Sequence, residues 1–139
     1  MPHISFKEVD YKTLNGRQQE IYNFQTVAGR LAKYGFNCIK LSDDWQGADF
    51  LAYHFDRKTT LKVQLKPRLA IYRKYEGEDL HVAFPHKDDW YLVEHDVLVK
   101  ELGRNTKCLQ TPSWNKKNGF YHTAAPSRKV IEALKDFRL

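Results

Sequence analysis

Side chains that can do chemistry gather in two neighbouring segments of this chain, residues 47–53 and 61–66. Asp49 opens the first, which is otherwise apolar, and Gln64 and Lys66 lie two positions apart in the second. Residues two apart in an extended strand point to the same face. Carboxylate and amide oxygens are ligands of Mg²⁺, and an ammonium group can stabilise a phosphate. The pattern therefore indicates a divalent metal held beside a phosphodiester.

A polar segment, residues 54–60, joins these two runs and predicts a β-hairpin. With its turn centred on Arg57 and Lys58, the hairpin places Asp49 opposite Lys66. Each side chain also has a structural explanation. Asp49 can cap the turn before its strand, and Gln64 and Lys66 can form the exposed face of a strand that is buried on one side. The chemical interpretation depends on these groups meeting at one place.

The order Asp49…Gln64-Leu65-Lys66 resembles the signature of the PD-(D/E)XK nuclease superfamily, which has the restriction-endonuclease-like fold. That family shows an acid, a short spacer and then (Asp/Glu)-x-Lys on the next strand, often with a Glu on the preceding helix. Asp49 matches the first acid, Lys66 matches the lysine and Glu20 is the candidate helix acid. Gln64 stands where an acid is usual, so one negative charge for metal binding is missing. The resemblance covers roughly residues 14–102.

The resemblance implies a metal-dependent DNA endonuclease with Mg²⁺, or Mn²⁺, as cofactor. Glu20, Asp49, Gln64 and the backbone carbonyl of Leu65 would hold the ion, and Lys66 would orient the attacking water and stabilise the phosphate. Small members of the family often act as homodimers. Two alternatives stay open: a nucleic-acid-binding module of the same fold without turnover, which Gln64 favours, and a protein-interaction or regulatory domain.

The charge balance favours a polyanionic partner, DNA first and RNA second. The chain has a formal net charge of +6 and a sequence pI of about 9.3. Basic and aromatic residues that could grip a nucleic-acid backbone or stack on bases are Arg68, Arg73, Lys74, Trp114, Lys116 and Lys117. The alternative for Trp114 is an anchor that packs its loop against the core.

Length and residue usage predict one domain, residues 1–139, in a cytoplasmic protein. The chain has 139 residues and no apolar run long enough to span a membrane, and its first residues lack the apolar block of a secretory signal. Without secretion cues, Cys38 and Cys108 are expected to be reduced thiols.

The hydrophobic pattern predicts a leading helix, a sheet built largely from hairpins and later helices, which is an α/β (α+β) domain. We expect a central mixed sheet of about five strands flanked by helices. Glu20 lies on or beside the apolar stripe of the first helix; the alternative for Glu20 is a rim residue paired with Arg17 or a solvated acid at the helix start. Predicted helices cover residues 16–34, 95–102 and a segment after Ser127; predicted strands cover 36–41, 49–55, 60–72 (interrupted at Pro67), 80–84 and 90–93; residues 42–47 and 104–126 are predicted to be irregular.

Overall fold

A five-stranded mixed sheet forms the centre of the molecule, as the sequence predicted. The structure, a computed structural model, describes residues 3–139. The strands run in the order β1-β2-β3-β5-β6, and every neighbouring pair is antiparallel except β3 with β5, which are parallel. Their bounds are β1 (Phe36–Trp45), β2 (Ala48–His54), β3 (Thr60–Leu65), β5 (His81–His86) and β6 (Asp89–Glu94).

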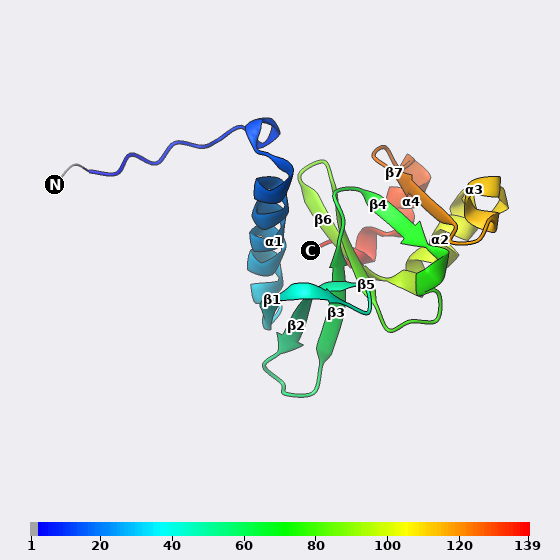
Figure 1. The fold of residues 1–139 in the computed structure, drawn as a ribbon, viewed down its shortest axis with the longest axis horizontal. Coiled ribbons are helices and arrows are strands. Elements are labelled where there is room, and N and C mark those ends of the chain that lie inside the picture. Colours follow the sequence, from blue (N-terminus) through cyan, green and yellow to red (C-terminus); the bar gives the residue numbers. More distant parts are fainter. Residues whose placement is uncertain (1–2) are drawn as a thin grey trace.

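Helices and a small second sheet cover the two faces of the central sheet (Figure 1). Helix α1 (Gly16–Ala32) packs on one face through Val27 and Leu31, which join a core cluster with Phe50 and Val63. A larger core lies on the other face, beneath α2 (His95–Asn105), α4 (Arg128–Ala133) and the two-stranded sheet of β4 (Leu69–Tyr72) and β7 (Phe120–Thr123). The central sheet is therefore sandwiched along much of its width. Within residues 3–139, no helix is long and apolar enough to cross a membrane.

Helix α1 begins where the sequence predicted and ends slightly earlier. Asn15 and Gln18 form a capping box, in which each side chain accepts a hydrogen bond from the other residue's backbone N–H. The helix ends at Ala32, and Gly35 follows with φ +86°, a conformation that glycine adopts at low cost. This exit turns the chain directly into β1.

Strand β1 is longer than the predicted strand 36–41, because residues 42–45, assigned to a loop, remain extended. The pairing with β2 shifts between Lys40 and Trp45, so the additional length is accommodated by an irregularity in the ladder. The turn is confined to Gln46 and Gly47, both with positive φ (55° and 87°), as a two-residue hairpin turn requires. The sequence of the turn was informative, but the polar residues before it concealed the strand.

The hairpin of β2 and β3 is present, but its predicted register is wrong by two residues. Phe50 pairs with Val63, and extending that register by one residue puts Gln64, not Lys66, opposite Asp49. The reason lies in the turn, where the Asp56 carboxylate accepts hydrogen bonds from the backbone N–H groups of two following residues and recentres the loop. A shift of two residues keeps every side chain on its predicted face.

The predicted third strand is interrupted at Pro67, as expected, and its second half joins a different sheet. β3 ends at Leu65, and β4 pairs antiparallel with β7 instead of continuing the central ladder. Strand β7 falls in a segment that was predicted to be irregular, so that prediction is wrong at residues 120–123. Lys66 lies at the break, where its backbone N–H donates to the Ala83 carbonyl at 2.9 Å.

The predicted later helices are present with one difference in length, and a short additional helix, α3 (Pro112–Asn115), lies in the segment that was predicted to be irregular. Helix α2 continues through Gly103 to Asn105 rather than closing at residue 102. Ser127 caps α4 as predicted, because its hydroxyl accepts a hydrogen bond from the backbone N–H of Val130 at 3.3 Å. His95, at the start of α2, is fully buried, and its Nε2 accepts the backbone N–H of Tyr72. This contact ties β4 to α2.

Candidate active site

Helix α1 places Glu20 beside the end of the central sheet. Glu20, Asn23, Val27 and Leu31 follow helical spacing, so they lie on one stripe of α1. Val27 and Leu31 are buried in the core, Asn23 is 8% exposed, and Glu20 is exposed at the open end of the stripe. The helix therefore directs a carboxylate along the rim of the sheet. No ion pair joins Glu20 to Arg17 within residues 3–139.

The start of β2 fixes Asp49 between two buried residues, Ala48 and Phe50. Its Oδ2 accepts a hydrogen bond of 2.7 Å from the backbone N–H of Leu65 on β3. In a continuing ladder this N–H would bond a backbone carbonyl of β2, so the side chain takes over where the ladder ends. Asp49 is therefore held in one orientation at the point where the two strands separate.

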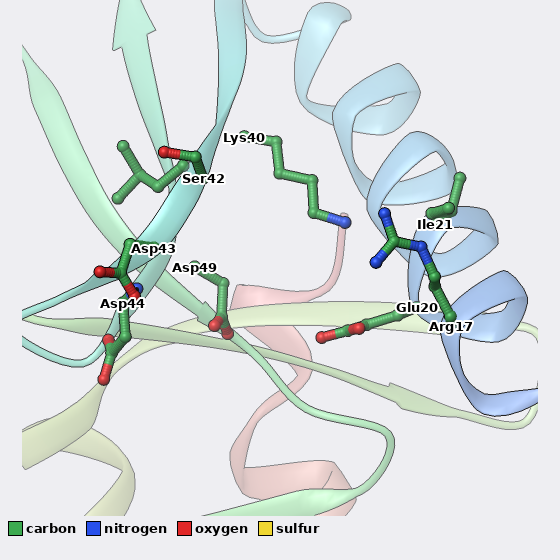
Figure 2. A pocket seen from close by; sticks show the side chains of 9 residues that line it. Arg17, Glu20, Ile21, Lys40, Ser42, Asp43, Asp44 and Asp49 are labelled. Atoms are coloured by element: carbon green, nitrogen blue, oxygen red, sulfur yellow. The ribbon is translucent and has the colours of Figure 1, made fainter.

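Glu20 and Asp49 face each other across a cleft. Figure 2 shows their carboxylates pointing toward one another, from α1 and from the sheet. Both residues line two adjoining pockets. One is lined further by Arg17, Ile21, Lys40, Leu41, Ser42, Asp43 and Asp44, and the other by Tyr11, Gly16, Gln19, Asn23, Leu65, Lys66 and Pro67. The structure thus brings together Glu20, Asp49, Leu65 and Lys66.

The electrostatics of this cleft oppose ionisation of Asp49. Burial raises the pKa of the Asp49 carboxyl, and the negative charges of Asp44 and Glu20 act in the same direction. The Leu65 N–H and the Lys66 ammonium lower the pKa, but they do not compensate fully. The ionised carboxylate is consequently poorly stabilised, chiefly because burial removes it from water. A bound cation would stabilise the ionised form.

Gln64 is nearly buried and carries an unsatisfied acceptor. Its side chain is 5% exposed, and its Oε1 has no hydrogen-bond partner. Buried amide oxygens are normally satisfied, so this one calls for an explanation. The printed pairing ends at Phe50 and Val63, and continuing it by one residue puts Gln64 across from Asp49. Gln64 does not line either pocket of the cleft, but an oxygen without a partner next to this carboxylate is compatible with a hard cation.

The atoms in or beside the cleft that could bind a metal ion are all oxygen atoms. No group of three or more His, Cys, Asp or Glu residues suited to a metal occurs among residues 3–139. The set instead consists of the carboxylates of Asp49 and Glu20, the amide oxygen of Gln64 and the carbonyl of Leu65. Oxygen donors of mixed charge suit Mg²⁺ or Mn²⁺ and disfavour softer metals. The residues present therefore fit a weakly held, hard divalent ion.

Lys66 lies between the cleft and a second, aromatic pocket. Its Nζ is 4.7 Å from the centroid of the Tyr72 ring, within range of a cation–π interaction. Lys66 lines the pocket that contains Asp49 and Glu20 and also the neighbouring pocket that contains Tyr72 and Phe120. Its ammonium group is thus available to a phosphate that enters the cleft from this side.

The basic residues proposed to bind nucleic acid occupy different surroundings. Arg68 is exposed next to Lys66. Arg73 donates to the Asn115 carbonyl at 3.3 Å and pairs with Glu76, so part of its charge is already engaged. Lys74 lies 5.0 Å from the Tyr75 ring centroid.

The short helix α3 and the loop between it and β7 carry the remaining three residues of that set. Lys116 lies 5.5 Å from the Phe120 ring centroid, and Lys117 is exposed. Trp114 is only 5% exposed and belongs to the larger core, as the alternative for this residue predicted. Its ring therefore anchors the loop, and the basic residues beside it remain at the surface.

Sequence reasoning missed four residues that line the cleft: Arg17 as a cleft cation, Asn23, Lys40 and Asp44. Asn23 carried a usable signal, because it is a polar residue on the buried stripe three positions after Glu20. Asp44 and Lys40 carried none, since their part of β1 alternates poorly and was assigned in part to a loop. Only the fold shows that this strand passes over the site.

Comparison with known proteins identifies the fold. No protein-family model and no curated protein sequence matches the chain significantly. Among solved structures, the chain is similar to the bacterial homing endonuclease I-Ssp6803I, with 15% sequence identity and a TM-score of 0.50 over 89% of this chain and 86% of that one. It is also similar to Hjc, a Holliday junction resolvase from the archaeal hyperthermophile Archaeoglobus fulgidus, with 16% identity and a TM-score of 0.41 over 55% of this chain and 72% of that one.

The chain has the restriction-endonuclease-like fold, which confirms the resemblance seen in its sequence. Three features position the cleft: the mixed sheet, helix α1 that covers it, and the placement of Asp49 and Lys66 at one end of β2 and β3.

Proposed function

We propose that this chain is a metal-dependent nuclease that hydrolyses phosphodiester bonds in DNA. One observation carries the proposal: Glu20 and Asp49, from two separate elements, face each other in a cleft that also contains Lys66. The homing endonuclease of similar fold is a nuclease by name, which supports the same chemistry here. The net charge of +6 supports a polyanionic substrate.

The groups that would hold Mg²⁺ or Mn²⁺ are the carboxylates of Asp49 and Glu20, the amide oxygen of Gln64 and the backbone carbonyl of Leu65. When bound, the ion supplies a Lewis acid and lowers the pKa of water. The chain fixes Asp49 for this role through the Leu65 N–H, before any ligand arrives. Gln64 contributes an oxygen without a charge, so we expect weaker metal affinity than an acid at this position would give.

Lys66 is the residue that acts on the substrate. Its ammonium orients the attacking water and offsets the negative charge that develops on the phosphate. β3 ends at Leu65 and Pro67 follows, so Lys66 lies just past the end of the central strand, where it lines the cleft. Lys40 and Arg17, which line the cleft with Glu20 and Asp49, can bind the flanking phosphates (Figure 2).

Cleavage of supercoiled plasmid DNA tests the proposal. We expect nicking in Mg²⁺ or Mn²⁺, none in EDTA, and loss of at least about 100-fold in rate for Lys66→Ala because a transition-state charge partner is removed. Lys100→Ala is the matched control, since Lys100 is exposed on α2 and lines neither pocket of the cleft. Full activity of Lys66→Ala, with its melting temperature unchanged, would remove Lys66 from the mechanism.

A second candidate function is a nucleic-acid-binding module without turnover. Gln64 in place of an acid favours it, together with the lack of a cluster of three metal-binding side chains in residues 3–139. Binding to DNA that weakens steeply with salt, with no nicking in either metal, would support this function over the nuclease.

The proposed assembly is a homodimer, as the family resemblance implies. Light scattering coupled to size-exclusion chromatography measures it, and a mass near that of one 16.4 kDa chain would reject it.

A further inference from the structure

A pocket of about 460 Å³ adjoins the Asp49 cleft at Lys66 and Pro67, which line both. It is lined by Lys66, Pro67, Arg68, Ala70, Tyr72, Phe120 and His122, and no carboxylate is among them. The combination of flat rings, two cations and no anion points to an aromatic, negatively charged ligand.

The two-stranded sheet builds the walls of this pocket. β4 and β7 pair so that Ala70 lies opposite His122 and Tyr72 opposite Phe120, which puts these four side chains on one face. The other face carries Leu69 and Ile71 into the core. Ala70, 2% exposed, forms the floor, and its small side chain leaves room between the rings. The rings are thus held at the surface by a buried backbone.

The rings form a nearly parallel series. Phe120 and His122 have centroids 5.5 Å apart with an interplanar angle of 1°, and Tyr72 and Phe120 have centroids 6.2 Å apart at 25°. Rings aligned in this way present flat faces and edges to a planar guest. His54 and Phe55 also form a stacked pair, with ring centroids 4.6 Å apart, but they line neither the cleft nor the pocket beside the two-stranded sheet.

We propose that this pocket binds a nucleobase that is unpaired, so that the phosphate next to it lies at Lys66 and enters the Asp49 cleft. The proposal rests on the nuclease function and adds a substrate class: DNA with a single-stranded or extrahelical base beside the cleaved bond. Lys66 borders both pockets, which links the base to the phosphate. A base inside a duplex is stacked on its neighbours, so its face cannot reach rings in a hollow.

Binding of an oligonucleotide that contains one 2-aminopurine tests the site in EDTA, where no cleavage occurs. We expect the fluorescence of the unpaired base to be quenched on binding, and the wild type to bind the single strand more tightly than the matching duplex. Phe120→Leu and His122→Ala should each weaken single-strand binding by about fivefold or more. His122 is exposed, so His122→Ala is a variant that we expect to fold normally. Phe55→Leu is the matched control and should bind as the wild type does.

Three results would overturn the proposal: equal affinity for paired and unpaired bases, unchanged binding by both Phe120→Leu and His122→Ala, or equal competition by an acidic phosphopeptide. The two proposals fail separately. A preference for unpaired bases without nicking in metal would refute only the nuclease. Nicking without that preference would refute only the base site.

Discussion

Gln64→Glu is the substitution that best separates a metal site from a structural one. Continuing the β2–β3 register by one residue puts residue 64 across from Asp49, and directly opposed side chains on antiparallel strands have Cβ atoms about 5 Å apart. Two carboxylates at about 5 Å repel by about 3 kcal/mol at an effective dielectric constant of about 20. This value is an upper bound, because Lys66 attracts both carboxylates and the new acid can take up a proton.

Without metal, we therefore expect Gln64→Glu to lower the free energy of unfolding by as much as about 3 kcal/mol. With metal, the added charge should strengthen binding, and each tenfold gain in affinity adds about 1.4 kcal/mol of stabilisation at saturating ion. The assay is thermal unfolding in EDTA and in Mg²⁺ or Mn²⁺. The difference in melting temperature between the two conditions should be larger for Gln64→Glu than for the wild type.

Gln110→Glu is the matched control, because Gln110 is exposed and the substitution adds the same negative charge at a residue that does not line the cleft. It should show the metal response of the wild type. If Gln64→Glu responds to metal no more than Gln110→Glu does, then the Gln64 side chain does not face the ion. If Gln64→Glu is as stable as Gln110→Glu in EDTA and also responds to metal no more strongly, then residue 64 is not beside the Asp49 carboxylate.

Two further predictions follow from the titrating groups. Because the folded pKa of Asp49 is raised above its unfolded value, the ionised carboxylate destabilises the fold at neutral pH. Asp49→Asn should therefore raise the melting temperature in EDTA at pH 7 while abolishing cleavage. A lower melting temperature would refute the charge argument. Burial lowers the folded pKa of His81 and of His95 below 6.5, so the unfolded chain binds more protons than the folded one. The free energy of unfolding should therefore fall as pH drops below about 6.5 toward the folded pKa values. Urea unfolding at pH 7.5 and 5.5 measures this loss of stability, and His81→Leu should reduce it.

Local patterns were sufficient to predict most elements of the fold. The helix start after Asn15, the break at Pro67 and the cap at Ser127 each depend on residues within three positions of one another, so they occur where the sequence places them. Strand β7 escaped prediction because its pairing with β4 is a contact between distant segments. Its four residues show too little alternation to be recognised alone.

The sequence alone determined the identities and faces of Asp49, Gln64 and Lys66, because alternation along a strand depends only on residue number. Tertiary structure decided which atoms meet. The Asp56 turn set the register and put Gln64 opposite Asp49, and the packing of α1 brought Glu20 to the same cleft. The pairing of β4 with β7 set the aromatic pocket beside Lys66. Such contacts depend on the closure of long loops and on the burial of distant apolar faces, and neither is written in a local pattern.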